Sequence, residues 1–362
     1  MSSAQAAAPV THLRADFYRP ELDVLRFGAF LLVFLHHALP HDAAGYLAAG
    51  IPKHAASVLA GLARAGALGV DLFFALSAYL ITELLLRERR SRGFIDVRAF
   101  YSRRILRIWP LYYVALFILA PAMSMLPAEH LPWRYSLAFA VFGGNWACAA
   151  WGYPSSSFAL LWSVSIEEQF YLVWPWLVRF GATCLRRIAY GMLAIASLTR
   201  VVLAIRDVQH PGIWCNTLAR LDPIAGGALL ACFLNGSVPT YSARSRVLTI
   251  GSGAVLLMAS GAGGNNAGWP VLIAYPLAAV ASVVIIGGVL GARLRTGAYL
   301  GKISYGLYVF HAAAIRLVTS PILALPLTIA AAAFSYRYLE SPFLRLKSRF
   351  TPILKAPLKS PP

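Results

Sequence analysis

Arg26 and His37 lie in one apolar segment of the sequence, eleven residues apart. At about 100° per residue, the two side chains lie on nearly the same face of a helix, with a rise of about 16 Å between them. An ionisable group among apolar residues needs a partner or a function, and a neutral imidazole can take a proton near neutral pH. His37 is therefore a candidate catalytic base. The alternative is that Arg26 only anchors the segment at a membrane surface and that His37 is structural.

Two carboxylates elsewhere in the sequence could hold a histidine base in position. Asp71 lies within an apolar segment and is expected to pair with a histidine or an arginine. Glu167 shares a helical face with Ser163 and Tyr171, because each of these is four residues away from it. A carboxylate beside an imidazole orients the ring and stabilises its protonated form. Glu167 and Asp71 are therefore both candidates for this role beside His37.

Three arginines precede a further apolar segment. Arg104 and Arg107 are three residues apart, so they lie side by side on one face of a helix. Guanidinium groups near the start of a helix suit a phosphate, because their charge, their fork geometry and the helix dipole act together. Arg103, Arg104 and Arg107 are therefore candidates for binding a phosphate-containing ligand. The alternative is that they only fix the orientation of the segment in a membrane.

The composition excludes an ordinary soluble domain, a disordered chain and a disulfide-linked scaffold. Apolar residues make up 59% of the 362 residues and charged residues 13%, and the mean hydropathy is +0.65, whereas a soluble domain is about half apolar and a quarter charged. At about 20 apolar residues per crossing, we expect an all-α polytopic membrane protein with about ten transmembrane helices. The expected spans are residues 22–40, 66–86, 107–126, 158–178, 188–205, 219–235, 246–262, 271–291, 300–318 and 322–339.

The net charge of +18 reflects membrane topology rather than nucleic-acid binding, because the basic residues cluster between the apolar segments. Membrane topology together with contact with anionic membrane lipid is expected to account for most of them, and no nucleic-acid partner is expected. The clusters place both termini in the cytoplasm only if residues 133–150 do not cross fully, so we predict a re-entrant or interfacial segment there. The expected organisation is a cytoplasmic segment 1–20, a transmembrane domain 21–345 and a basic, proline-rich cytoplasmic tail 346–362.

Seven short motifs, taken in order, resemble those of the membrane-bound acyltransferase-3 family. The motifs are Arg26 with His37, Gly69-Val-Asp71-Leu-Phe-Phe, Arg103-Arg104-Ile-Leu-Arg107-Ile-Trp-Pro110, Trp162-Ser-Val-Ser-Ile-Glu167-Glu-Gln-Phe-Tyr171, Arg220-Leu-Asp222, Ser304-Tyr305-Gly306-Leu-Tyr308-Val-Phe-His311 and Glu340-Ser-Pro342. The resemblance covers the chain from about residue 20 to residue 345. It is to the stand-alone form of the family, which has no C-terminal esterase-like domain.

This resemblance implies an enzyme of the bacterial inner membrane that transfers an acyl group, commonly acetyl, from cytoplasmic acyl-CoA to a carbohydrate or other hydroxyl acceptor on the far side. It assigns the family's arginine–histidine motif to Arg26 and His37, and its functional carboxylate to Glu167. Its R-x-x-R motif falls on Arg104 and Arg107. The residues that we expect to contact substrate are Trp162, Arg220, Asp222, Ser304, Tyr305, Tyr308 and His311.

The expected mechanism is general base catalysis. The phosphates of acyl-CoA would lie at Arg104 and Arg107, and the thioester near His37, which would take the proton of the acceptor hydroxyl. An acyl-enzyme intermediate is an open alternative. His311 is expected to matter less than His37, as a structural histidine. The candidate donors to the oxyanion are Ser304, Tyr308 and Arg26.

No metal is expected, because the histidines lack a ligand spacing such as H-E-x-x-H. The alternative function is a transporter or flippase that moves a glycan intermediate or an anion, since intramembrane aspartate, arginine and histidine also suit proton-coupled carriers. Paired half-helices and symmetry between the two halves, which would favour a carrier, are missing from the sequence.

Overall fold

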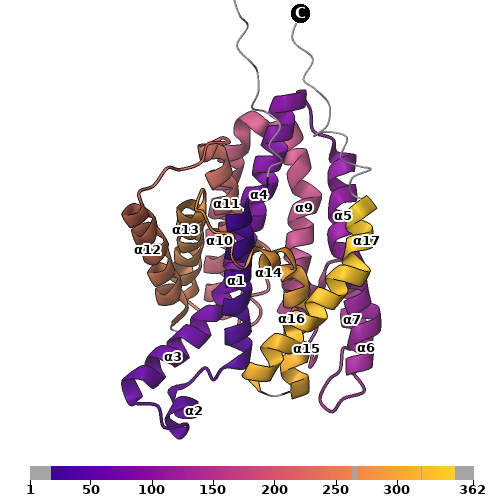
Figure 1. The fold of residues 1–362 in the computed structure, drawn as a ribbon, viewed down its shortest axis with the longest axis vertical. Helices are drawn as coiled ribbons and strands as arrows, with labels where there is room; N and C mark the ends of the chain where they lie inside the picture. The colour runs from indigo at the N-terminus through magenta and orange to yellow at the C-terminus, as the bar shows by residue number, and fades with distance from the viewer. Residues whose placement is uncertain (1–17, 263–266, 319, 347–362) are drawn as a thin grey trace, which may run out of the picture.

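A computed structural model describes residues 18–262, 267–318 and 320–346 of the chain (Figure 1). Within these residues the structure contains helices and connections and no strand, which confirms the all-α prediction. The helices are α1 (Pro20–Ala38), α2 (Ala43–Ala48), α3 (Lys53–Ala65), α4 (Gly69–Arg92), α5 (Val97–Val114), α6 (Ala120–Met123), α7 (Trp133–Ala140), α8 (Gly144–Trp151), α9 (Leu161–Gly181), α10 (Leu185–Ile205), α11 (Leu221–Leu234), α12 (Ala243–Ala262), α13 (Val271–Val289), α14 (Ala298–Lys302), α15 (Ser304–Val318), α16 (Pro321–Ser335) and α17 (Ser341–Leu346).

Each of the ten predicted spans contains a helix. Six helical stretches in the described part of the chain are long and apolar enough to cross a membrane, which indicates a multi-pass membrane protein. These stretches are Lys53–Arg92, Val97–Met123, Leu161–Ile205, Ala243–Ala262, Val271–Val289 and Pro321–Leu346. The count of ten crossings and the cytoplasmic position of both ends stay predictions. Most of the predicted segment 1–20 and of the predicted tail 346–362 lies outside the described residues.

The segment 133–150 forms two short helices instead of a span. α7 and α8 are eight residues long each, so each extends about 12 Å along its axis. A hydrocarbon core is about 30 Å thick. Neither helix can therefore cross it alone, which agrees with the charge pattern, since that pattern requires a segment that does not cross fully. The re-entrant or interfacial position of the segment stays a prediction.

The helices α2 and α3 were not expected from the sequence. They connect α1 to α4 at the end of the molecule opposite to the connection between α4 and α5 (Figure 1). Their sequences are rich in alanine and too short or too polar to stand out as an apolar run of membrane-spanning length. Hydropathy alone therefore misses them.

Five helices form a closed ring around the middle of the molecule. In the order α1, α4, α9, α5 and α15, each helix packs against the next, and α15 packs against α1. Two glycines allow close approach of the neighbouring backbones, since a Cβ atom on Gly69 would lie 2.5 Å from the carbonyl oxygen of Ala29, and one on Gly227 2.0 Å from that of Ala75. α1 and α11 are thereby held tightly against α4, and α4 in turn forms one wall of the ring.

Candidate active site

A cavity of about 90 Å³ lies inside this ring of five helices. Every helix of the ring contributes polar side chains to its lining, although these residues are spread from position 26 to position 308. The polar lining residues are Arg26, Ser77, Arg104, Arg107, Ser163, Glu167, Tyr171, Ser304, Tyr305 and Tyr308. Seven of them are residues that the sequence analysis selected, so the fold brings most of the predicted site together.

Cations gather at one end of the cavity. Arg26 Nη1 is paired with Asp23 Oδ1 at 2.6 Å, whereas the Arg104 guanidinium lies over the ring of Tyr171, 5.4 Å from its centroid. Among the described residues, no carboxylate lies within ion-pair distance of Arg104 or Arg107. A partly buried cation without an acidic partner favours an anionic ligand.

The carboxylate of Glu167 occupies the middle of the lining. It accepts hydrogen bonds from Ser77 Oγ and from the Tyr171 hydroxyl, both at 3.0 Å. Ser163 lies one turn of α9 from Glu167, on the side away from Tyr171. Its hydroxyl oxygen is 2.6 Å from that of Tyr308. Glu167 therefore links α4 and α9 through neutral hydroxyls, and its hydrogen bonds are to these groups rather than to an imidazole.

Two histidines meet beyond Tyr308. Nδ1 of His37 lies 3.2 Å from Nε2 of His311 and 2.9 Å from the carbonyl oxygen of Val33. Nδ1 of His311 lies 2.7 Å from the carbonyl oxygen of Tyr308. His311 is completely buried, whereas His37 is exposed. The place beside His37 that the sequence analysis gave to Glu167 or Asp71 is therefore occupied by a second imidazole.

The histidine pair lies next to the cavity without lining it. On α15, Ser304 and Tyr308 face the cavity and His311 follows less than one turn later, on the face that their spacing predicts. The polar groups thus run from Arg104 and Arg107 past Glu167 and Tyr308 to the histidines. The spacing along α15 could place His311 on this face, but it could not show that α1 lies opposite.

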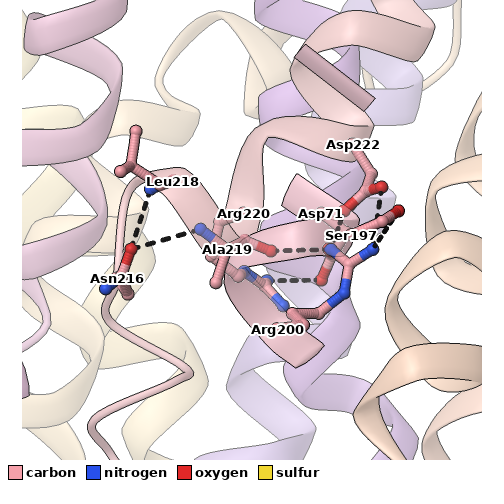
Figure 2. A network of polar contacts seen from close by, with 8 residues as sticks. All are labelled: Asp71, Ser197, Arg200, Asn216, Leu218, Ala219, Arg220 and Asp222. Atoms are coloured by element: carbon pink, nitrogen blue, oxygen red, sulfur yellow. Dashed lines mark hydrogen bonds and ion pairs between the residues drawn. The ribbon is translucent and has the colours of Figure 1, made fainter. Parts of the chain in front are cut away.

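Asp71 belongs to a buried cluster of ion pairs outside the cavity lining (Figure 2). Its Oδ2 accepts from Arg220 Nη2 at 2.7 Å, which confirms the expected arginine partner. Arg200 pairs in the same way with Asp222, with Nη2 3.2 Å from Oδ1. The Arg220 guanidinium also stacks on the ring of Trp214, 4.1 Å from its centroid. Arg220 and Asp222, which were expected to contact substrate, are thus enclosed by protein groups.

Arg200 was missed by the sequence analysis, although a signal was present. It is a single arginine within the apolar segment 188–205, and such a residue needs a partner or a function. Two other predicted residues also lie outside the cavity lining. Arg103 forms an ion pair with Glu88 at 3.5 Å, and Trp162 is buried with its ring centroid 5.9 Å from that of Trp214.

The buried cluster predicts a large effect on stability. Asp71→Leu leaves Arg220 buried without the carboxylate that it pairs with, and is expected to cost about 3–5 kcal/mol of stability. Asp71→Leu combined with Arg220→Met removes both charges and is expected to recover most of this loss. Thermal unfolding of the detergent-purified variants measures both. Equal melting temperatures of the single and the double variant would show that the countercharge of Asp71 does not stabilise the fold.

Comparison with known proteins identifies the family of the chain. A family model described as "Acyltransferase domain" matches residues 19–337. A Staphylococcus aureus (strain MSSA476) protein named "Putative O-acetyltransferase SAS0844" is 28% identical over 365 residues, which cover 90% of this chain and 57% of that protein. The "Peptidoglycan O-acetyltransferase OatA" of Listeria monocytogenes is 28% identical over 324 residues, covering 77% of this chain and 51% of that protein. The "O-acetyltransferase OatA" of S. aureus (strain NCTC 8325 / PS 47) is 25% identical and covers 90% of this chain and 57% of that protein.

The chain thus spans little more than half the length of these curated relatives. No solved structure matches it. The family model covers most of the chain, including every helix of the ring and all the motifs around the cavity. The chain therefore belongs to the membrane-bound acyltransferase-3 family.

Proposed function

We propose that the chain is a membrane O-acyltransferase that transfers an acetyl group from acyl-CoA to a hydroxyl of a carbohydrate. The observation that carries this proposal is a cavity that has at one end two guanidinium groups with no carboxylate partner among the described residues, and beyond its other end a pair of imidazoles. Family membership and the names of the relatives, one of which specifies peptidoglycan, support acetyl transfer to a glycan. We place the enzyme in a bacterial inner membrane, with the donor entering from the cytoplasm.

The arginine end suits the phosphates of the donor. Arg104 and Arg107 have no carboxylate partner among the described residues, and a guanidinium binds phosphate through two parallel hydrogen bonds. From there the slender pantetheine arm would follow the cavity past Glu167 and Tyr308. The thioester at its end would thus arrive beside His37.

The histidine end suits the acceptor. His37 is exposed, so a hydroxyl can reach its ring from outside while the donor occupies the cavity. His37 takes the proton of this hydroxyl, and the oxygen forms a bond to the thioester carbonyl carbon. The carbon–sulfur bond then breaks, and the leaving thiolate takes from His37 the proton that came from the acceptor hydroxyl. The products are the ester and free coenzyme A. Ser304 and Tyr308 line the cavity and are our candidates for donors to the oxyanion.

Ligand-dependent stability tests the donor part of the proposal. Coenzyme A is expected to raise the melting temperature of the purified protein, with about 2.7 kcal/mol of stabilisation at a concentration of 100 times the dissociation constant. Pantetheine, which has the arm without the nucleotide phosphates, is expected to stabilise far less at the same concentration. Equal effects of the two compounds would contradict phosphate recognition by the arginines.

The acceptor part is tested in cells. Mass spectrometry of envelope glycans, with and without the gene, is expected to show an acetyl ester that depends on the gene. A transporter or flippase would instead change the amount of a glycan at the surface without changing its esters. Unchanged ester content, in cells that produce the protein, would reject the O-acyltransferase.

A further inference from the structure

We infer that His311 is a positioning residue, which fixes Nε2 of His37 as the basic nitrogen and supports its protonated ring. This inference rests on the proposed function, because it gives the partner of the proposed base. It differs from the sequence analysis, which treats His311 as a structural or substrate-contacting histidine. The positions of the hydrogen atoms follow from three contacts, one within α1, one within α15 and one between the two helices.

The first contact determines which ring nitrogen of His311 carries the hydrogen. Its Nδ1 lies 2.7 Å from the carbonyl oxygen of Tyr308. A carbonyl oxygen only accepts hydrogen bonds, so Nδ1 of His311 carries the hydrogen. In a neutral ring, Nε2 is then left with a lone pair and acts as an acceptor. His311 therefore presents an acceptor, rather than a donor, to His37.

The second and third contacts determine which ring nitrogen of His37 carries the hydrogen. Its Nδ1 lies 2.9 Å from the carbonyl oxygen of Val33 and 3.2 Å from Nε2 of His311. Both neighbours are acceptors, so Nδ1 of His37 carries the hydrogen and shares it between them. The lone pair of His37 is consequently on Nε2, which makes no hydrogen bond to another described residue.

Protonation of His37 during the reaction strengthens the same contacts. When Nε2 takes the proton of the acceptor hydroxyl, the Nδ1–H group becomes part of an imidazolium, and hydrogen bonds from a charged donor are stronger than those from a neutral one. A carboxylate has this supporting role in the serine–histidine–aspartate triad. Here the acceptor is neutral, and moving the charge onto the completely buried His311 would be costly, so the charge stays on His37.

The other titratable groups around His37 come from the end of α1 and the connection that follows it. The ring of His36 lies 5.1 Å from that of His37, measured between centroids, and the ring of His41 stacks on His36 at 4.3 Å. Nδ1 of His36 lies 2.9 Å from the carbonyl oxygen of Ala63, within hydrogen-bond distance. Among the described residues, no carboxylate lies within ion-pair distance of the His37 ring, so His311 is the side chain hydrogen bonded to it.

The test compares His311→Gln with His311→Leu. The amide oxygen of glutamine can still accept from Nδ1 of His37, whereas leucine only fills the apolar space. Loss of one hydrogen bond to a charged group predicts a turnover about 10- to 150-fold lower in His311→Leu, with most of it restored in His311→Gln. Membrane vesicles containing each variant are given labelled acetyl-CoA, and label in the glycan fraction is counted per amount of protein. KM for acetyl-CoA is expected to stay unchanged in both variants.

The order of the two variants separates the inference from a packing role. If His311 only fills a buried space, leucine serves better than glutamine, and activity falls equally at all pH values. If His311 supports the protonated base, the acid limb of the pH–rate profile of His311→Leu moves to lower pH, because the charged form of His37 has lost an acceptor. A His311→Leu variant at least as active as His311→Gln would overturn the inference.

A double variant separates this inference from the proposed function. Residues that act through one another are not additive, so His311→Leu is expected to reduce activity no further in a His37→Ala background. A further fall of tenfold or more in that background would overturn the inference alone. Nearly normal turnover of His37→Ala itself would instead reject His37 as the base, and with it the proposed mechanism.

Discussion

Replacing His37 by alanine is expected to lower the rate of acyl transfer by about 10²- to 10⁴-fold, the range that a general base contributes. The variant removes the exposed imidazole that has a lone pair on Nε2, while its neighbours His311 and Val33 keep their places in α15 and α1. The His37 ring is exposed near the end of α1, so the variant is expected to remain folded although it loses the contact with His311. Transfer of label from acetyl-CoA to the glycan fraction measures the loss.

The matched control for this variant is His54→Ala. His54 is an exposed histidine at the start of α3, a helix that is not one of the ring of five, and its loss is expected to leave turnover within about twofold, as for a surface substitution. Binding of coenzyme A, followed by thermal stabilisation, is expected to be the same in both variants. A His37→Ala protein that binds coenzyme A and turns over at a nearly normal rate would rule out His37 as the base.

Periodicity along single helices made much of the site predictable. Ser304 and Tyr308 face the cavity together, and so do Arg104 and Arg107, because a spacing of three or four residues is fixed by the α-helix itself. The helix locations were predictable for a similar reason, since an apolar run of about 20 residues has few alternatives to a helix in a membrane. These properties depend on local sequence only.

Contacts between helices were not predictable in the same way. Asp71 needed a cationic partner, but the sequence contains many arginines. It does not show how α4 is aligned with the start of α11, so Arg220 could not be identified as the partner. The same applies to His37 and His311, which are 274 residues apart. Each contact depends on which helices are neighbours, and close approaches such as that of Gly227 to Ala75 decide this.

Charge balance separates the two groups of intramembrane arginines. Arg200 and Arg220 are completely buried, and each has its own aspartate, so this cluster is neutral and closed to ligands. Arg104 and Arg107 line a cavity without such partners in the described structure. A low-dielectric site keeps a cation only if something compensates its charge. The second group is therefore suited to an anion from outside the protein, and under the proposed function this anion is the phosphate portion of the donor.

This difference predicts the effect of Arg104→Gln and of Arg107→Gln. Under the proposed function each variant loses a charge-assisted contact to a donor phosphate, so KM for acetyl-CoA is expected to rise about 10- to 150-fold. The matched control is Arg98→Gln, which changes an exposed arginine on the same helix α5 and is expected to leave KM within about twofold. Arg104→Lys is expected to recover only part of the loss, because an ammonium group keeps the charge without the two-pronged geometry.

The arginine variants also distinguish binding from catalysis. At saturating acetyl-CoA they are expected to approach the turnover of the unchanged protein, whereas His37→Ala cannot be rescued by more donor. Raised salt is expected to weaken the unchanged protein's affinity for coenzyme A more than that of the variants, since part of the attraction is electrostatic. If Arg104→Gln and Arg98→Gln raised KM equally, the arginines would act only through the general positive charge of this end of the molecule. The cavity would then lose its assignment as the donor site.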